Sequence, residues 1–194
     1  MSAVVLTAAV RPWQFPSALI DRIALADGRE LVLRPVLSFD AAAEQDFVRA
    51  LSAASRLKRF HFGLRELPPS MLRAMTEVDH HAHVALVAEA FDADEEATIV
   101  ADARYVRGPS SGLAADEAEF AIAVADAWQG AGLGRRMMKR LGQHAARHGV
   151  AHLVGDVLPD NGAMFSLVAT LGGQRLASPN GPGVTRVRFD LNRA

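Results

Sequence analysis

The stretch Glu119-Phe-Ala-Ile-Ala-Val-Ala-Asp-Ala-Trp-Gln-Gly-Ala-Gly-Leu-Gly134 decides the fold. Its apolar first half indicates a strand over 117–125, and the glycines after Gln129 indicate a tight turn into a helix over about 132–148. The first N–H groups of a helix have no partner within the helix, and they lie at the positive end of its dipole. The turn therefore predicts a seat for a phosphate group.

The glycine pattern differs from the two commonest nucleotide motifs. A P-loop ends in Gly-Lys-Ser/Thr, whereas Gly134 is followed by Arg135 and Arg136. A dinucleotide fingerprint needs three glycines that open a βαβ unit, and an acid about 20 residues later. The spacing here is Gln-x-x-Gly-x-Gly. An ordinary helix start with a glycine cap is the alternative interpretation.

Composition limits the remaining choices. The chain has 194 residues, no cysteine and a net charge of −1, which predicts one domain and excludes disulfides, thiolate metal sites and a cysteine acyl-enzyme. We expect no nucleic-acid or membrane partner, because the chain carries no strong basic excess and no long apolar span. We also expect a cytoplasmic location.

The pattern around this stretch predicts an α/β fold with a mixed sheet. We expect an irregular lead over 1–20 and one domain over 21–194, starting with a hairpin that turns at Asp27-Gly28. Ser38 is the expected cap of a helix that reaches about residue 52, and a second helix starts at 68–70. The other expected elements are strands at 84–88, 98–106, 153–158, 175–177 and 184–191, a helix from about 161 to 172, and a loop at 108–112.

This order and these motifs resemble the GNAT acyltransferase superfamily, and specifically the acetyltransferase domain of Pat-type protein lysine acetyltransferases. The resemblance rests on Ser52-x-x-Ser55-Arg-Leu-Lys-Arg-Phe60, Thr76 to Ala88, Ala118-Glu-Phe-Ala121, the glycine turn and Leu158-Pro-x-Asn161. It implies a mostly antiparallel central sheet flanked by helices on both faces, and acetyl-CoA (CoA) as the cofactor.

The resemblance also assigns roles on the donor side. The pyrophosphate of acetyl-CoA is expected on the turn, Val124 pairs with the pantetheine arm, and Asn161, which also suits a helix N-cap, contacts the cofactor. A family bulge near 121–124 is expected to splay this strand from its neighbour. The residues expected at the pyrophosphate are Gln129, Gly130, Ala131, Gly132, Leu133, Gly134 and Arg135, with Arg136 as a further candidate.

Acetyl transfer to an amine needs a base, because a lysine amine has a pKa of about 10.4 and is protonated at neutral pH. Glu119 matches the glutamate that serves as base in Pat-type domains, and partial burial is expected to raise its pKa. A solvated surface acid is the alternative, with Asp116 and Glu117 as substitute bases. The acid that many GNAT members supply from a tyrosine is absent, since Val168 stands at that position and Gly173 replaces a usual aromatic.

We expect direct attack by a lysine ε-amine of another protein. A small-molecule amine is the first alternative, with Asp79, Asp116 and Glu117 as candidate lining acids, and a non-catalytic acyl-CoA-binding module is the second. His83 is a candidate for substrate contact. No metal site is expected from His80, His81 and His83 or from the pair His144 and His148, which lack the glutamate of a zinc protease motif. The oligomeric state has no sequence signal.

Overall fold

The computed structural model describes residues 15–108 and 113–193. Most of the expected lead and of the expected loop at 108–112 lies outside the described residues. The boundary between a lead and a domain at residue 20 stays a prediction; Leu19, within the expected lead, is buried in the core.

Eight strands form one sheet in the order β1-β2-β3-β4-β5-β6-β8-β7. Neighbouring strands are antiparallel except β5 and β6, which run parallel. The expected mixed, mostly antiparallel sheet is therefore confirmed. The strands are β1 (Asp21–Ala24), β2 (Glu30–Pro35), β3 (His83–Phe91), β4 (Ala97–Val106), β5 (Glu117–Val124), β6 (His152–Val157), β7 (Gln174–Ala177) and β8 (Thr185–Asp190).

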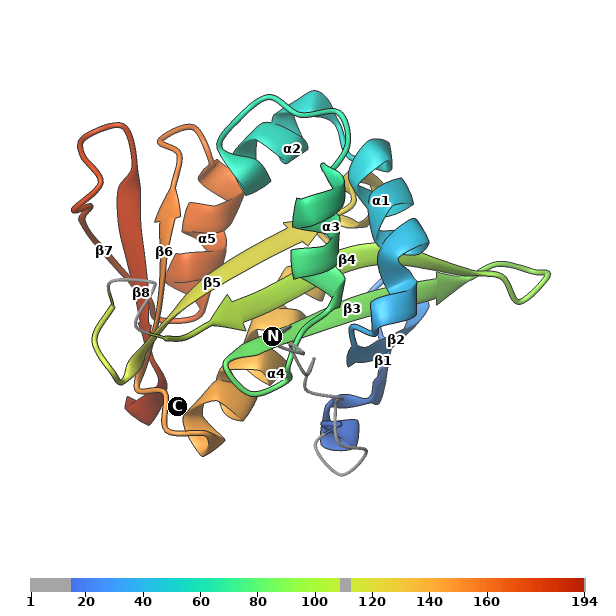
Figure 1. The fold of residues 1–194 in the computed structure, drawn as a ribbon, viewed down its shortest axis with the longest axis horizontal. Helices are drawn as coiled ribbons and strands as arrows, with labels where there is room; N and C mark the ends of the chain where they lie inside the picture. The colour runs from blue at the N-terminus through green and yellow to red at the C-terminus, as the bar shows by residue number, and fades with distance from the viewer. Residues whose placement is uncertain (1–14, 109–112, 194) are drawn as a thin grey trace, which may run out of the picture.

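Helices cover both faces of the sheet, as expected (Figure 1). Three of them lie toward the viewer in Figure 1, and α4 crosses behind the central strands. The helices are α1 (Ala41–Ala50), α2 (Ala53–Phe60), α3 (Pro69–Thr76), α4 (Leu133–Arg147) and α5 (Gly162–Thr170).

Alternation along β3 shows how the sheet separates two cores. Val84, Leu86 and Ala88 pack into a cluster with α4 and α5. Ala85 and Val87 point the other way, into a cluster with α1, α2 and α3. Successive side chains of a strand point to opposite faces, so β3 contributes side chains to both cores. Its even-numbered residues here face the α4–α5 side and its odd-numbered residues face the α1–α3 side.

The region before α3 differs from the sequence prediction. The helix expected from Ser38 to about residue 52 is instead a 3₁₀ turn (Ser38–Asp40) followed by α1, and the helix α2 was not predicted. Ser38 is not the cap, because Asp40 fills that position and accepts a hydrogen bond from the Leu37 N–H at 2.7 Å. Ser52 caps α2 instead, accepting from the Ser55 N–H.

The sheet opens between β5 and β6. These strands pair only from Glu117 to Glu119, opposite His152 to Val154, and they then run apart (Figure 1). Pairing between β4 and β5 continues without a register shift as far as Val124. The expected splay is therefore present, while the expected bulge is absent from the β4–β5 ladder.

No helix in the described part of the chain is long and apolar enough to span a bilayer.

Candidate functional site

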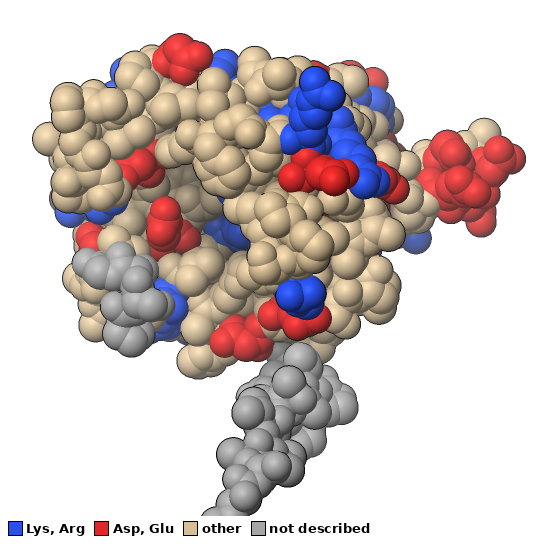
Figure 2. Space-filling model, turned by 45° about the horizontal axis from the view of Figure 1, so that its top comes forward, with Lys and Arg blue, Asp and Glu red and all other residues tan. Residues whose placement is uncertain are grey.

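A cavity of about 660 Å³ fills the opening between β5 and β6. Its walls come from β5, β6, the glycine turn, the start of α4, α5 and the end of α2. The face shown in Figure 2 is hollowed, and acidic and basic side chains both reach the hollow. The cavity brings together these predicted residues: Glu119, Val124, Gln129, Gly130, Gly132, Leu133, Gly134, Arg135 and Asn161.

One edge of β5 presents free backbone groups to the cavity. The Ala125 N–H donates to the Val100 carbonyl at 2.8 Å, so in this antiparallel pair the odd residues of β5 bond to β4. Phe120, Ile122 and Val124 therefore direct their N–H and C=O groups toward β6, which has diverged. Such an edge can pair with an extended ligand as a sheet pairs with an added strand.

The start of α4 is open to a ligand. Its N-cap, Gly132, has φ of +86° and no side chain, so no side chain caps the helix. The first intrahelical bond in this turn runs from the Arg136 N–H to the Gly132 carbonyl at 3.2 Å. The N–H groups of Leu133, Gly134 and Arg135 therefore have no helical acceptor, and the helix dipole adds positive potential there. The other two helices beside the cavity are capped by Ser52 and Asn161.

Glu119 lies at the other end of the cavity, on the face of β5 that α1, α2 and α3 cover. Its side chain is exposed rather than partly buried as expected. The substitute bases Asp116 and Glu117 do not line the cavity. Among the acids of the described chain, only Glu119 and Asp156 line it.

Comparisons with known proteins agree with this geometry. The acetyltransferase (GNAT) family matches residues 51–172. The chain belongs to the GNAT acetyltransferase family. An acetyltransferase of Pseudomonas aeruginosa is 32% identical over 154 residues, which cover 78% of this chain and 80% of that protein.

The resemblance to Pat-type domains is confirmed as well. Acetyltransferase Pat of Mycolicibacterium smegmatis is 31% identical over 150 residues, which cover 77% of this chain and 43% of that longer protein. The crystal structure of the GNAT domain of S. lividans PAT superimposes with a TM-score of 0.82 at 28% identity, covering 91% of this chain and 99% of that one. The chain is thus an acetyltransferase, and acetyl-CoA is its cofactor.

Two residues expected at the pyrophosphate, Gln129 and Ala131, are set apart from the others by their surroundings in this GNAT acetyltransferase. The Gln129 amide is engaged within the protein, because its Nε2 donates to the Val124 carbonyl at 2.9 Å and lies 3.4 Å from Ser55 Oγ. Ala131 does not line the cavity and packs against the core under α4. Arg135 lines the cavity and Arg136 does not. The seat is therefore mainly backbone.

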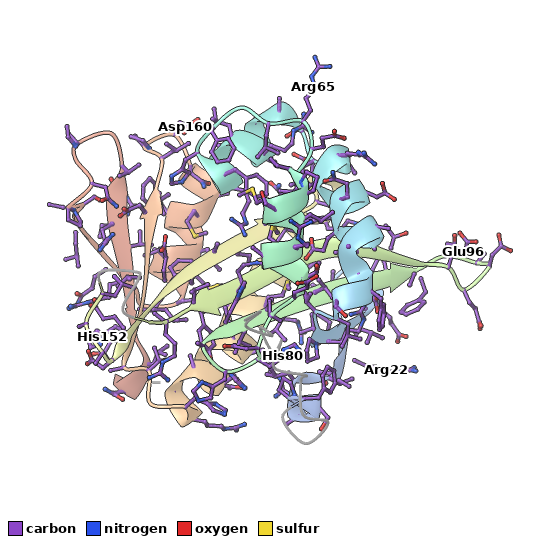
Figure 3. The ribbon with its side chains drawn as sticks, in the orientation of Figure 1. Arg22, Arg65, His80, Glu96, His152 and Asp160 are labelled. Atoms are coloured by element: carbon purple, nitrogen blue, oxygen red, sulfur yellow. The ribbon has the colours of Figure 1, made fainter. Side chains whose placement is uncertain are left out.

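Asn161 lies at the cavity and also caps a helix. It lines the cavity, and its Oδ1 accepts a hydrogen bond from the Met164 N–H at 3.2 Å, which caps α5. The neighbouring Asp160 marks this turn at the top of Figure 3, far from Glu96 at the tip of the β3–β4 hairpin. One side chain thus fixes the start of α5 against the cavity wall.

Residues of α2 form a wall that the sequence did not predict. Lys58 and Arg59 of α2 and His61, which follows it, line the cavity. The N-terminal end of α2 is tied to the glycine turn, since Ser52 Oγ and Ser55 Oγ each donate to Asp126 Oδ1 at 2.8 Å. The sequence motif contains both serines, but local pattern predicts neither the helix that they begin nor their bonds to Asp126, which lies 71 residues after Ser55.

Behind α2 lies a buried charge network. Asp102 forms a two-bond ion pair with Arg104, whose guanidinium also donates to Glu44 Oε1 at 3.3 Å. The Arg59 guanidinium lies 3.5 Å from the Asp102 carboxylate. Because Arg59 also lines the cavity, it joins this network to the cavity wall. Burial, and next the Asp102 charge, raise the pKa of Glu44 to about 8, so Glu44 is mostly protonated at neutral pH and two arginines share one carboxylate.

At the position where many GNAT members have a tyrosine acid, this chain has a valine that packs in the core. Val168 is 1% exposed in the cluster under α4 and α5. A Cβ at Gly173 would lie 2.8 Å from Phe189 and 2.9 Å from Val168, so an aromatic residue at this position has no room. The two departures from the common GNAT pattern, Val168 and Gly173, are therefore linked, because both residues pack in the same part of the core.

The remaining candidates lie outside the cavity. The Asp79 carboxylate accepts the backbone N–H groups of residues 81, 82 and 83, which shapes the turn into β3. His83 is 3.3 Å from Arg104 and does not line the cavity. Within residues 15–108 and 113–193, no group of three or more His, Asp or Glu side chains is placed to hold a metal ion.

Proposed function

We propose that this GNAT acetyltransferase transfers the acetyl group of acetyl-CoA directly to a lysine ε-amine of another protein, with Glu119 as the general base. One observation carries the proposal: the uncapped start of α4 and the Glu119 carboxylate lie at two ends of one cavity, joined by the open edge of β5. We further propose that the enzyme acts in the cytoplasm.

On the donor side, the N–H groups of Leu133, Gly134 and Arg135 would hold the pyrophosphate, and the Arg135 guanidinium would add charge. The pantetheine arm would pair with the backbone of Ile122 and Val124. The Val124 carbonyl already accepts from Gln129, so the N–H of Val124 is the group left for the ligand. These contacts run from the turn toward Glu119.

On the acceptor side, Glu119 takes a proton from the ammonium group, directly or through a water. The neutral nitrogen then attacks the thioester carbonyl to form the C–N bond, and the C–S bond breaks with its electron pair on the sulfur. The second proton of the nitrogen passes to the departing thiolate or to solvent. A thiolate of pKa about 8.5 is a good leaving group without a dedicated acid, which agrees with the buried Val168.

The lining charges favour a protein lysine over a polyamine. A polyamine pocket needs several free carboxylates, and the second lining acid, Asp156, is paired with Arg186. The same cavity carries Lys58 and Arg59, which would repel a second or third ammonium group. The likeness to Pat-type domains supports the same choice.

The test is an acceptor screen that follows CoA release with acetyl-CoA as donor. We expect turnover with an N-terminally blocked peptide that carries one lysine, and at least tenfold lower kcat/KM with spermidine. A preference for spermidine would contradict the protein acceptor. Stable acetyl-CoA binding with no turnover on peptides, proteins or small amines would contradict catalysis.

A further inference from the structure

The Asp156 carboxylate, on the wall of the cavity, has an unusual number of donors. It accepts from Ser178 Oγ at 3.0 Å, Asn180 Nδ2 at 2.6 Å and Arg186 Nε and Nη2 at 3.0 and 3.1 Å. These bonds lower the pKa of Asp156 against a burial cost that would raise it. Asp156 is therefore a fixed anion whose principal cationic partner is Arg186.

Sheet register places this pair on the same face as Glu119. Glu119 lies opposite Val154 on β6, and Asp156 follows two residues later, so both side chains point to the α1–α3 side. Arg186 lies opposite Asp156 on β8 and faces the same way. Arg186 donates two hydrogen bonds to Asp156, and these bonds, followed by the charges of Asp156, Glu119 and Glu117, raise the pKa of Arg186.

Other charged groups lie on the same face as Glu119, and each arginine among them has a partner of its own. Arg188, across Val154 from Glu119, bonds to Gln174 Oε1 at 3.4 Å, and Arg104 is committed to Asp102. On the face that Glu119 shares, the titratable and charged groups of the neighbouring strands are Glu117 on β5, His83 on β3, Asp102 and Arg104 on β4, His152 and Asp156 on β6, and Arg186, Arg188 and Asp190 on β8. Lys58 and Arg59 of α2 and His61, which follows α2, line the same cavity.

We propose that Asp156 is a positioning residue that holds the Arg186 guanidinium away from Glu119 and so keeps the Glu119 carboxylate free to accept a proton. An arginine paired with Glu119 would favour its charged form and weaken it as a base. Because Asp156 binds Arg186 through two parallel hydrogen bonds, the guanidinium has a fixed direction. The inference rests on the proposed role of Glu119.

The test is a carboxyl-carbon NMR titration of Glu119, with the resonance assigned by its loss in Glu119→Gln. Asp156→Asn keeps the shape but removes the anion, so Arg186 is released and the titration midpoint of Glu119 falls by about 0.5 pH unit or more. Arg186→Gln leaves an unpaired Asp156 anion, so the midpoint rises. The double variant returns it close to the wild-type value, and Arg186→Lys, which keeps the charge, shifts it less than Arg186→Gln.

Removal of Arg186 should raise the Glu119 midpoint by more in the Asp156→Asn background than in the wild-type background, because charges that stay in place would give additive shifts. Additive shifts would overturn the inference. Shifts of one sign, or none, in variants that still show an acetyl-CoA-induced thermal shift would overturn it. The NMR readout needs no acceptor, so it is independent of the proposed function. Failure of the base itself would appear separately, as unchanged turnover in Glu119→Gln.

Discussion

Asn161 is a residue whose two roles can be separated. Its Oδ1 caps α5 through the Met164 N–H, and the side chain also lines the cavity. Asn161→Ala should cost about 1 kcal/mol of stability, as lost N-caps do, whereas Asn161→Ser keeps a capping oxygen and most of that stability. If the amide contacts acetyl-CoA, both variants should lose affinity.

Urea unfolding and calorimetric titration with acetyl-CoA measure the two effects. Full acetyl-CoA affinity in Asn161→Ser and in Asn161→Ala would restrict this residue to capping. Ser166, which is exposed on α5 and lies outside the cavity lining, offers a control: Ser166→Ala should change neither cap nor cofactor affinity.

For single residues, the sequence indicated which side chains lie at the cavity better than it indicated their hydrogen-bond partners. Glu119, Val124 and Asn161 were placed correctly at one cavity because strand and turn positions follow from local pattern. The Gln129 contact with the Val124 carbonyl was missed, because a side chain that bends back five residues leaves no periodic signal. Asp156 was missed because its donors come from a hairpin 22 to 30 residues away.

The glycine turn is the element that sets donor binding. Gly132 has φ of +86°, and nothing lies within 4 Å of a Cβ built there. Gly132→Ala should therefore cost about 1–2 kcal/mol through backbone strain alone, and it should weaken acetyl-CoA binding by displacing the free N–H groups of α4.

Gly149, after α4, is a matched control with φ of +80° and equally open space. Gly149→Ala should lose similar stability and keep its acetyl-CoA affinity. Equal affinity losses in the two variants, measured by calorimetry, would contradict the assignment of the phosphate seat to this turn.

Helix α2 shows why one element escaped prediction. Only Leu51 and Ser52 separate α2 from α1. So short a break leaves no clear gap in the sequence pattern, and the cap at Ser52 falls within the one helix that the pattern predicts there. What defines α2 is non-local: its serines bond Asp126, and Arg59 reaches Asp102. The acceptor-side wall follows from these contacts, which single-sequence periodicity cannot show.

For the whole molecule, buried titratable groups predict a stability maximum near pH 6.5. Burial lowers the pKa of His83 and His144 to about 4 and also lowers that of His80, which is labelled in Figure 3. Their unfolded forms bind more protons, so stability is lost as pH falls from about 6.5 toward 4. The pKa of Glu44, raised from 4.5 to about 8, acts oppositely, and stability is lost as pH rises through that range.

Urea unfolding from pH 4.5 to 9 checks this prediction. Each group contributes a slope of up to about 1.4 kcal/mol per pH unit. His144→Gln should flatten the acid side, and Glu44→Gln should flatten the alkaline side, because glutamine resembles the protonated acid. Unchanged slopes in both variants would contradict the assignment.

The most direct test of the proposed chemistry is the turnover of Glu119→Gln relative to wild type from pH 7 to pH 10, with saturating acetyl-CoA and a lysine peptide. We predict unchanged acetyl-CoA affinity and a kcat lowered by about 10²–10⁴-fold at pH 7. The deficit should shrink toward pH 10, because the amine then loses its proton to solvent. A kcat equal to wild type at pH 7, or a deficit that does not change with pH, would contradict Glu119 as the base.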